Sequence, residues 1–112
     1  MDREEILNYK LKYNELYHCY QSLLSDTQKA ILEEFLVYDL SLSEIAEDRK
    51  ISRAAVEDAI KKGVSKLDAF EDSLKIFEKK QKILENTAKL KELAGNSKEL
   101  KAIITDIEKE II

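Results

Sequence analysis

Apolar residues recur at alternating spacings of three and four positions along almost the whole chain, and almost nothing interrupts them. There is no proline, and the two glycines are Gly63 and Gly95. Because that spacing places side chains on one face of an α-helix, and because glycine and proline usually punctuate helices, the pattern predicts helix nearly throughout. The fold class is therefore all-α. A chain of 112 residues also fits a single domain, residues 1–112, with a core of its own.

The first expected helix runs from about Asp2 to Leu23 and is rich in tyrosine. Asp2 and Glu5 resemble a capping box at its start. Its apolar stripe consists of Ile6, Tyr9, Tyr13, Leu16, Tyr20 and Leu23. Tyrosine rings with a polar tip suit a half-buried packing surface, which we expect here, and a stacking platform for nucleic-acid bases is the alternative.

Serines mark the starts of the next three helices. Ser25 begins a helix that ends near Tyr38, with a buried face of Ile31, Leu32, Phe35 and Leu36. Ser41 or Ser43 begins a short helix whose inward residues are Leu42, Ile45 and Ala46. Ser52 begins the fourth, whose stripe runs from Val56 to Phe77 with no breaker except Gly63. This favours a long helix that reaches about Lys80 or Asn86.

The C-terminal part of the chain predicts one more helix with a strongly apolar face. Gly95 reads as the residue after a helix end, and Asn96 or Ser97 caps the helix that follows. The apolar face consists of Leu100, Ile103, Ile104, Ile107 and Ile111. Such a stripe is too hydrophobic to face water. It packs on the long helix or on a second copy of the chain, so we expect a homodimer through this stripe and the seam from Leu67 to Phe77.

The segment from Leu24 to Leu67 has the order of a helix-turn-helix. It reads Ser41-Leu42-Ser43-Glu44-Ile45-Ala46-Glu47, then Ile51-Ser52-Arg53, then Ala55-Val56. A small residue at Ala46 lets two helices cross closely, and Ser52 starts the helix that would face a major groove. This stretch resembles region 4 of bacterial sigma-70 factors. The resemblance implies a helix-turn-helix over residues 24–67, preceded by an N-terminal helix and followed by a long helical extension over residues 68–112.

The chain as a whole is similar to the YlxM family, also called UPF0122. The similarity covers the tyrosine-rich first helix, Leu24-Ser25-x-x-Gln28, the run from Tyr38 to Glu47, Ser52-Arg53-Ala54-Ala55-Val56 and the charged tail. It implies a small protein of Gram-positive bacteria and mycoplasmas, with an accessory or regulatory role beside the GTPase of the signal recognition particle. The chain departs from the family pattern at Lys50, where Gly or Asn is common, at Ala54, usually Gln, and at Glu57-Asp58-Ala59, usually Tyr-Asp-Asn.

Basic residues of the motif gather on its second helix and on the turn before it. Residues 52–67 hold four cations against two acids, whereas residues 25–51 hold three cations against seven acids. The candidate binding residues for nucleic acid or a partner are Arg49, Lys50, Ser52, Arg53, Lys61, Lys62 and Lys66. Glu57 and Asp58 lie among them and would repel phosphates. The sequence therefore leaves three partners open, namely DNA, as for a sigma-like transcriptional regulator, the targeting RNA, and the targeting GTPase. A purely structural dimer module that binds none of them is the remaining alternative.

Composition argues against catalysis, cofactors and membrane insertion. The net charge is −4, whereas nucleic-acid-binding domains are usually basic. His18 and Cys19 are the only residues of their kinds, so neither a metal site nor Cys–His catalysis is expected within one chain. No glycine-rich loop could cradle a phosphate. No apolar run is long enough to span a membrane and no signal peptide is expected, so we expect a cytoplasmic, non-enzymatic protein.

Overall fold

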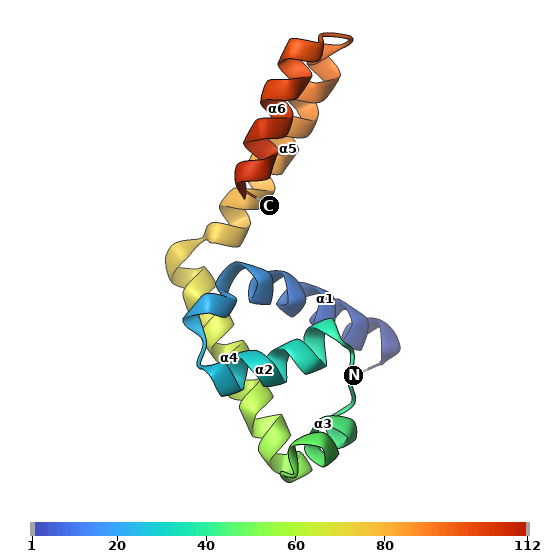
Figure 1. Cartoon of the computed structure of the whole chain (residues 1–112), viewed down its shortest axis with the longest axis vertical. Coiled ribbons are helices and arrows are strands. Elements are labelled where there is room, and N and C mark those ends of the chain that lie inside the picture. Colours follow the sequence, from blue (N-terminus) through green and yellow to red (C-terminus); the bar gives the residue numbers. More distant parts are fainter. Residues whose placement is uncertain (1, 112) are drawn as a thin grey trace. The chain divides into compact units, whose positions relative to one another are not determined.

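The computed structural model describes residues 2–111, in which the α-helices follow one another with short connections (Figure 1). No strand occurs among these residues, so the all-α prediction is confirmed. The elements are α1 (Arg3–Tyr20), η1 (Gln21–Leu23, 3₁₀), α2 (Asp26–Leu32), η2 (Glu33–Val37, π-helical), α3 (Leu42–Arg49), α4 (Arg53–Leu74), α5 (Ile76–Ala94) and α6 (Lys98–Ile111).

The helices group into two compact units. The N-terminal unit, Met1–Leu74, contains α1 to α4, and the C-terminal unit, Lys75–Ile112, contains α5 and α6. The boundary corrects one expectation, because the helix from Ser52 does not run on to Lys80 or Asn86. It ends at Leu74, and Lys75 takes the left-handed conformation with φ of 56°. No glycine or proline announces this break, so the uninterrupted spacing of apolar residues could not reveal it.

Tyrosines of α1 form much of the core of the N-terminal unit. Tyr17 and Tyr20 are 2% and 0% exposed, and Tyr13 is also buried. The Tyr13 hydroxyl donates to Asp68 at 2.9 Å, and the Tyr20 hydroxyl donates to Glu71 at 2.5 Å. Burial and the Asp68 contact raise the pKa of Tyr13 to about 12. The packing interpretation of these rings is confirmed, and their hydroxyls join α1 to α4.

Two ends of the predicted α1 stripe are not buried. Ile6 is 44% exposed and Leu23 is 52% exposed, while Tyr17, which lies off that stripe, is almost fully buried. Ile6 precedes the part of α1 that packs against the unit, and Leu23 lies in the 3₁₀ turn η1, where the α-helical period no longer holds. The predicted stripe is therefore buried at its centre, as expected, and exposed at both ends, where the prediction was wrong.

Helices α2 and α4 approach each other closely at Gly63. A Cβ atom on Gly63 would lie 2.7 Å from Cδ1 of Leu32, which is itself fully buried. Overpacking a close-packed core costs about 1–3 kcal/mol. The glycine inside α4 is therefore needed for the packing of α2, which explains a residue that otherwise weakens a helix.

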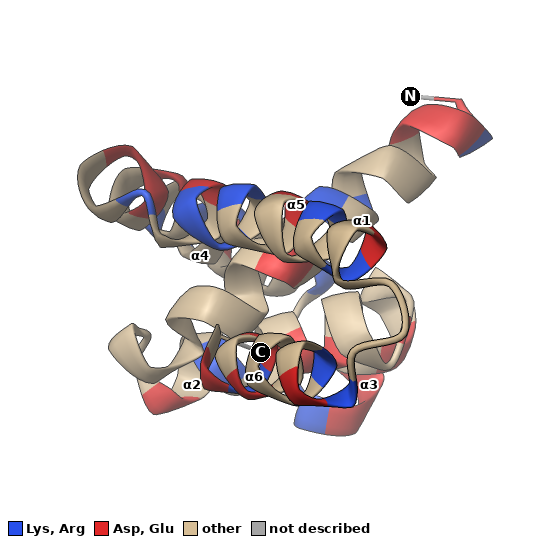
Figure 2. Cartoon of the chain, turned by 90° about the horizontal axis from the view of Figure 1, so that it is seen from above, with Lys and Arg blue, Asp and Glu red and all other residues tan. Residues whose placement is uncertain are grey.

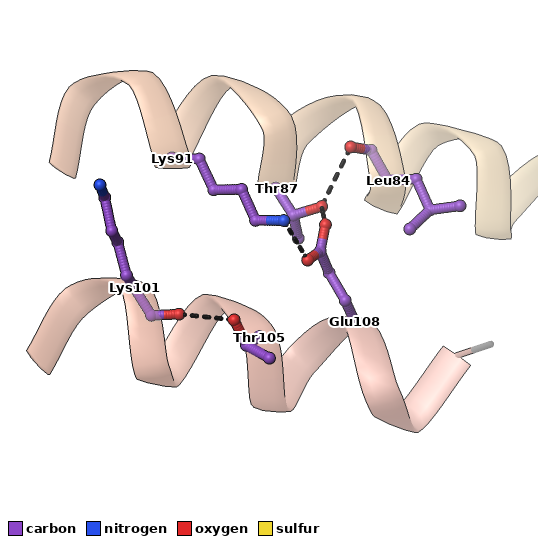
Figure 3. A network of polar contacts seen from close by, with 6 residues as sticks. All are labelled: Leu84, Thr87, Lys91, Lys101, Thr105 and Glu108. Atoms are coloured by element: carbon purple, nitrogen blue, oxygen red, sulfur yellow. Dashed lines mark hydrogen bonds and ion pairs between the residues drawn. The ribbon is translucent and has the colours of Figure 1, made fainter. Parts of the chain in front are cut away.

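The C-terminal unit is a hairpin of two helices that run side by side in opposite directions (Figure 1). Gly95, with φ of 58°, ends α5, and the Ser97 hydroxyl accepts a hydrogen bond from the Leu100 N–H at 3.3 Å, so both sequence signals are confirmed. Figure 3 shows the polar contacts between the helices, in which Glu108 accepts from Lys91 at 2.5 Å and from the Thr87 hydroxyl at 2.9 Å. No helix among the described residues is long and apolar enough to cross a membrane.

Candidate partner-binding surface of the helix-turn-helix

Helices α3 and α4 form the helix-turn-helix, and each start is fixed by a serine. The Ser41 hydroxyl accepts from the Glu44 N–H at 3.1 Å, and the Glu44 carboxylate accepts from the Ser41 N–H at 3.2 Å. The Ser52 hydroxyl accepts from the Ala55 N–H at 3.0 Å. Ser52 is thus the N-cap of α4, which is the place that the sequence assigned to it.

The turn between the two helices places Lys50 in the left-handed region, with φ of 55°. The Ile51 N–H donates to the Ala46 carbonyl oxygen at 3.1 Å, and the Lys50 N–H donates to the Glu47 carbonyl oxygen at 3.3 Å. This pair of bonds is a Schellman motif, whose left-handed position usually holds glycine. Lys50 therefore adopts a strained backbone conformation, and its exposed side chain stands at the tip of the turn.

Arg49 is tied into the scaffold. Its Nε donates to Glu34 Oε2 at 2.9 Å, and its Nη2 donates to Glu34 Oε1 at 3.0 Å. Both side chains are less than one third exposed, so solvent screens this bidentate pair only in part. The pair joins α3 to η2. In this arrangement the guanidinium of Arg49 is used by the fold and not offered to a partner.

The cations of α4 mostly have partners within the protein. Arg53 Nε lies 3.8 Å from Glu57 Oε1, and Lys62 Nζ lies 2.9 Å from Asp58 Oδ2. These acids, one turn away on the same helix, neutralise cations that would otherwise face a phosphate backbone. Lys66 donates to Gln28 at 2.9 Å and so links α4 to α2. No ion pair is recorded for Lys50 or Lys61 in the described part of the chain, and both are exposed.

Beside this surface lies an open groove of about 460 Å³ that is lined by both apolar and charged residues. Four segments of the N-terminal unit meet there, namely α1, η2, the start of α3 and the first turns of α4. Its apolar lining includes Ile6, Tyr9, Phe35, Leu42 and Ile60, and its charged lining is Lys10, Arg53, Glu57 and Lys61. Lys10 also lies over the Phe35 ring at 4.5 Å and pairs with Asp39. We call this the α1–α4 groove. It can hold apolar side chains of a partner while its charged residues contact charged groups.

Sequence reasoning found only part of this groove. It singled out Arg53 and Lys61 as candidate residues, but it assigned Lys10 no role and assigned Tyr9 and Phe35 to packing. One sequence signal lies near them. Leu7 and Leu11, four positions apart, are apolar residues off the predicted stripe of α1 and so indicate a second apolar face at this end of the helix. In the structure they are 57% and 55% exposed, although neither lines the groove itself.

Among residues 2–111 there is no cluster of three histidine, cysteine, aspartate or glutamate side chains that could hold a metal ion. Cys19 is half-buried and His18 packs edge-on against the Tyr17 ring at 5.7 Å. The groove described above is the positive feature of this region, and its lining suits the binding of a partner.

Comparison with known proteins gives the family. A family model described as "Putative helix-turn-helix protein, YlxM / p13 like" matches residues 7–107. The chain belongs to this family, UPF0122. A UPF0122 protein of Fusobacterium nucleatum is 47% identical over 70 residues, which are 62% of this chain and 68% of that protein. A UPF0122 protein of Halalkalibacterium halodurans is 38% identical over 71 residues, or 63% and 65%. A probable UPF0122 protein of Mycoplasma mycoides is 39% identical over 74 residues, or 66% of each.

The match to these UPF0122 relatives spans about two thirds of their length. The family resemblance drawn from the motifs is confirmed, and so is the helix-turn-helix. The names of the relatives state no activity and no partner, so what the α1–α4 groove or the helix-turn-helix binds is a matter for proposal.

Proposed function

We propose that this chain is a non-enzymatic accessory protein of the signal recognition particle pathway, in which the helix-turn-helix unit binds the targeting GTPase as a protein partner. The link to that pathway is what the resemblance to the YlxM family implies, and it is the part of the proposal that the binding experiment below tests. The observation that carries the choice of a protein partner is the α1–α4 groove, whose lining combines five apolar residues with four charged ones.

The electrostatics of α4 support a protein partner over a phosphate backbone. Binding to nucleic acid is driven largely by cations that displace counterions from phosphates. Here Arg53 and Lys62 are each paired with an acid one turn away, and Arg49 is bound to Glu34. A protein surface can instead use the exposed apolar groups beside these pairs, since apolar burial at the centre of an interface contributes most of its affinity.

The second candidate is a sigma-like DNA-binding transcriptional regulator. It is favoured by the position of Arg53, which is 64% exposed in the first turn of a serine-capped second helix, where such helices contact base edges. It is opposed by Ala54, which offers no group for reading a base, and by Glu57, which is 47% exposed beside it. The targeting RNA is a third ligand, to be tested in the same experiment.

Binding of the full chain to three purified ligands tests the proposal. The ligands are the targeting GTPase, its RNA, and a library of promoter-length DNA duplexes at physiological salt. We expect saturable binding to the GTPase, with DNA retained only weakly and without sequence preference. Binding to one DNA sequence that is lost in Arg53→Ala would overturn the proposal in favour of the regulator. Binding to the RNA alone would overturn the choice of a protein partner.

A matched pair of variants shows whether the groove is the surface used. Ile6→Glu places a charge on an exposed apolar residue of the groove, whereas Leu23→Glu does so on a similarly exposed residue outside it. Because both side chains are about half exposed, neither change should unfold the unit. We expect Ile6→Glu to weaken GTPase binding by at least about tenfold, or about 1.4 kcal/mol, and Leu23→Glu to leave it unchanged. Equal effects would place the interface elsewhere.

A further inference from the structure

We infer that the hairpin of α5 and α6 is half of a four-helix bundle, and that a second copy of this chain supplies the other half. The first argument is its size. The C-terminal unit is shorter than the roughly 40 residues below which domains usually need disulfides, metals or oligomerisation to fold. The only cysteine, Cys19, belongs to the other unit, and no metal-binding cluster occurs among the described residues.

The second argument is that the hairpin has almost no core. Among its described residues only Thr87 and Ile104 are buried, at 2% and 5% exposure. Large apolar side chains on both helices remain open to solvent. Those on α5 are Ile76, Ile83, Leu90 and Leu93, and those on α6 are Leu100, Ile103 and Ile107. A surface of this kind on so small a unit indicates an interface.

The third argument is that the exposed residues lie in register for helix pairing. Ile76, Ile83 and Leu90 are spaced by seven positions, so they share one face of α5, and Ile103 and Ile107 lie one turn apart on α6. Between the helices runs an open groove of about 210 Å³ that is lined by apolar residues alone, from Leu90 and Leu93 on α5 to Leu100 and Ile107 on α6. No charged group in the groove would meet the occupant, so the occupant is apolar as well.

The charges of α5 and α6 favour a second copy of the chain as the partner that covers this groove. Helix α5 carries five lysines and three glutamates, whereas α6 carries three lysines and four acidic residues. Figure 2 shows these basic and acidic segments along the two helices. In a bundle made of two antiparallel hairpins related by a twofold axis parallel to the helices, α5 of one copy lies beside α6 of the other, and the charges favour this arrangement. The more basic helix then faces the more acidic one, twice, across the same apolar seam.

A membrane surface fits the face less well. Helices that lie in a membrane interface are rich in Lys and Arg on the polar side and use Trp or Phe on the other. Helix α5 has more lysines than acids and one aromatic residue, Phe77, but α6, which supplies the other half of the face, has neither an excess of lysine nor an aromatic residue. The seam from Leu67 to Phe77, which sequence reasoning also assigned to a dimer, is a poorer candidate because Leu67 is fully buried in the core of the N-terminal unit.

Sedimentation equilibrium of the full chain, from nanomolar to high micromolar concentration, tests the inference. The expected result is a reversible dimer of twice the 13.0 kDa chain mass, with helix content by circular dichroism that falls on dilution because the isolated hairpin is not stable. A monomer at high micromolar concentration with full helix content would overturn the inference. So would a monomer that sediments with phosphatidylglycerol vesicles.

Two variants locate the interface. Ile103→Asp changes a residue that is 57% exposed in the hairpin, and Leu11→Asp changes one that is 55% exposed in α1. Ile103→Asp should weaken self-association by at least about tenfold, while Leu11→Asp should leave it unchanged. The reverse pattern would overturn the assignment to the hairpin. Leu93→Lys repeats the test at a side chain that is 84% exposed, where substitution cannot disturb the fold of one copy.

Discussion

Arg49 and Glu34, 15 positions apart, form a bidentate ion pair between α3 and η2, with N–O distances of 2.9 and 3.0 Å. Arg49, which the sequence made a candidate for binding a partner, therefore stabilises the contact between α3 and η2 instead. The same holds for Ser52, which caps α4, and for Lys66, which contacts Gln28. The surface left for a partner is therefore Lys50, Lys61 and the α1–α4 groove.

The first prediction concerns the stability that Arg49 provides. Arg49→Ala should lower the free energy of unfolding of the N-terminal unit by about 1–2 kcal/mol, because it leaves Glu34 half-buried without its partner. Arg53→Ala is the control, since its pair with Glu57 is exposed and should contribute at most about 0.5 kcal/mol. Urea unfolding followed by tyrosine fluorescence reports on this unit alone, because all five tyrosines lie in it. Equal losses in the two variants would contradict the assignment.

The second prediction concerns the left-handed backbone of Lys50. Lys50→Gly should raise the free energy of unfolding by about 1 kcal/mol, because glycine adopts this conformation without a Cβ clash. The same change at Lys62, inside α4, should lower it by about 1 kcal/mol. Opposite signs for one substitution at two exposed lysines would be difficult to explain by charge. A loss of stability in both variants would mean that Lys50 is not held in the left-handed region.

The third prediction compares two buried tyrosines of α1. The hydroxyl of Tyr17 is buried without a hydrogen-bond partner among the described residues, while that of Tyr20 donates to Glu71. Tyr17→Phe should therefore leave the N-terminal unit equally stable or more stable, because it removes a desolvated polar group. Tyr20→Phe should lower its stability by about 1.5–3 kcal/mol, as expected for a hydrogen bond to a charged group. Thermal unfolding of both variants distinguishes these roles, and a larger loss from Tyr17→Phe would contradict them.

The fourth prediction concerns the pH dependence of the contacts that Glu108 makes in the hairpin of α5 and α6. The hydrogen bond from Lys91, followed by that from Thr87, lowers the pKa of Glu108 below its ordinary value of 4.5. Because the folded-state pKa is the lower one, these contacts stabilise the hairpin above about pH 4.5, and that contribution is lost as the pH falls through the folded-state pKa. A carboxyl-carbon NMR titration should show the midpoint of Glu108 rise in Lys91→Met and stay in place in Lys89→Met. An unchanged midpoint in Lys91→Met would mean that the pair does not form.

The helix starts could be predicted because they depend on neighbours three positions away. Asp2, Ser25, Ser41 and Ser52 each accept the expected backbone hydrogen bond. The break at Lys75 could not be predicted, since apolar residues continue at helical spacing through it. What changes towards the break is burial. Leu67 is fully buried, whereas Leu74 is 45% exposed. Both are leucines on the same apolar stripe, so the sequence around them does not show which one is buried.

The candidate surface was predicted in part for the same reason. The sequence placed Arg53 and Lys61 on the exposed side of the second helix, which is a local property of helical spacing. It could not show that Glu34 would bind Arg49, or that Tyr9, Phe35 and Lys61 would line the same groove, because these arrangements join segments far apart in the chain. Nonlocal packing decides which cations remain available to a partner.

Lys61 and Lys62 provide the most direct test of the central claim, which is that the helix-turn-helix unit binds a protein through the α1–α4 groove. Both are exposed cations of α4, but only Lys61 lines the groove. The measurement is the affinity of Lys61→Glu and Lys62→Glu for the targeting GTPase by titration calorimetry. The account predicts a loss of about tenfold or more for Lys61→Glu and little change for Lys62→Glu. Equal losses in both variants, accompanied by an equal loss of DNA retention, would show that α4 binds phosphates and would contradict the account.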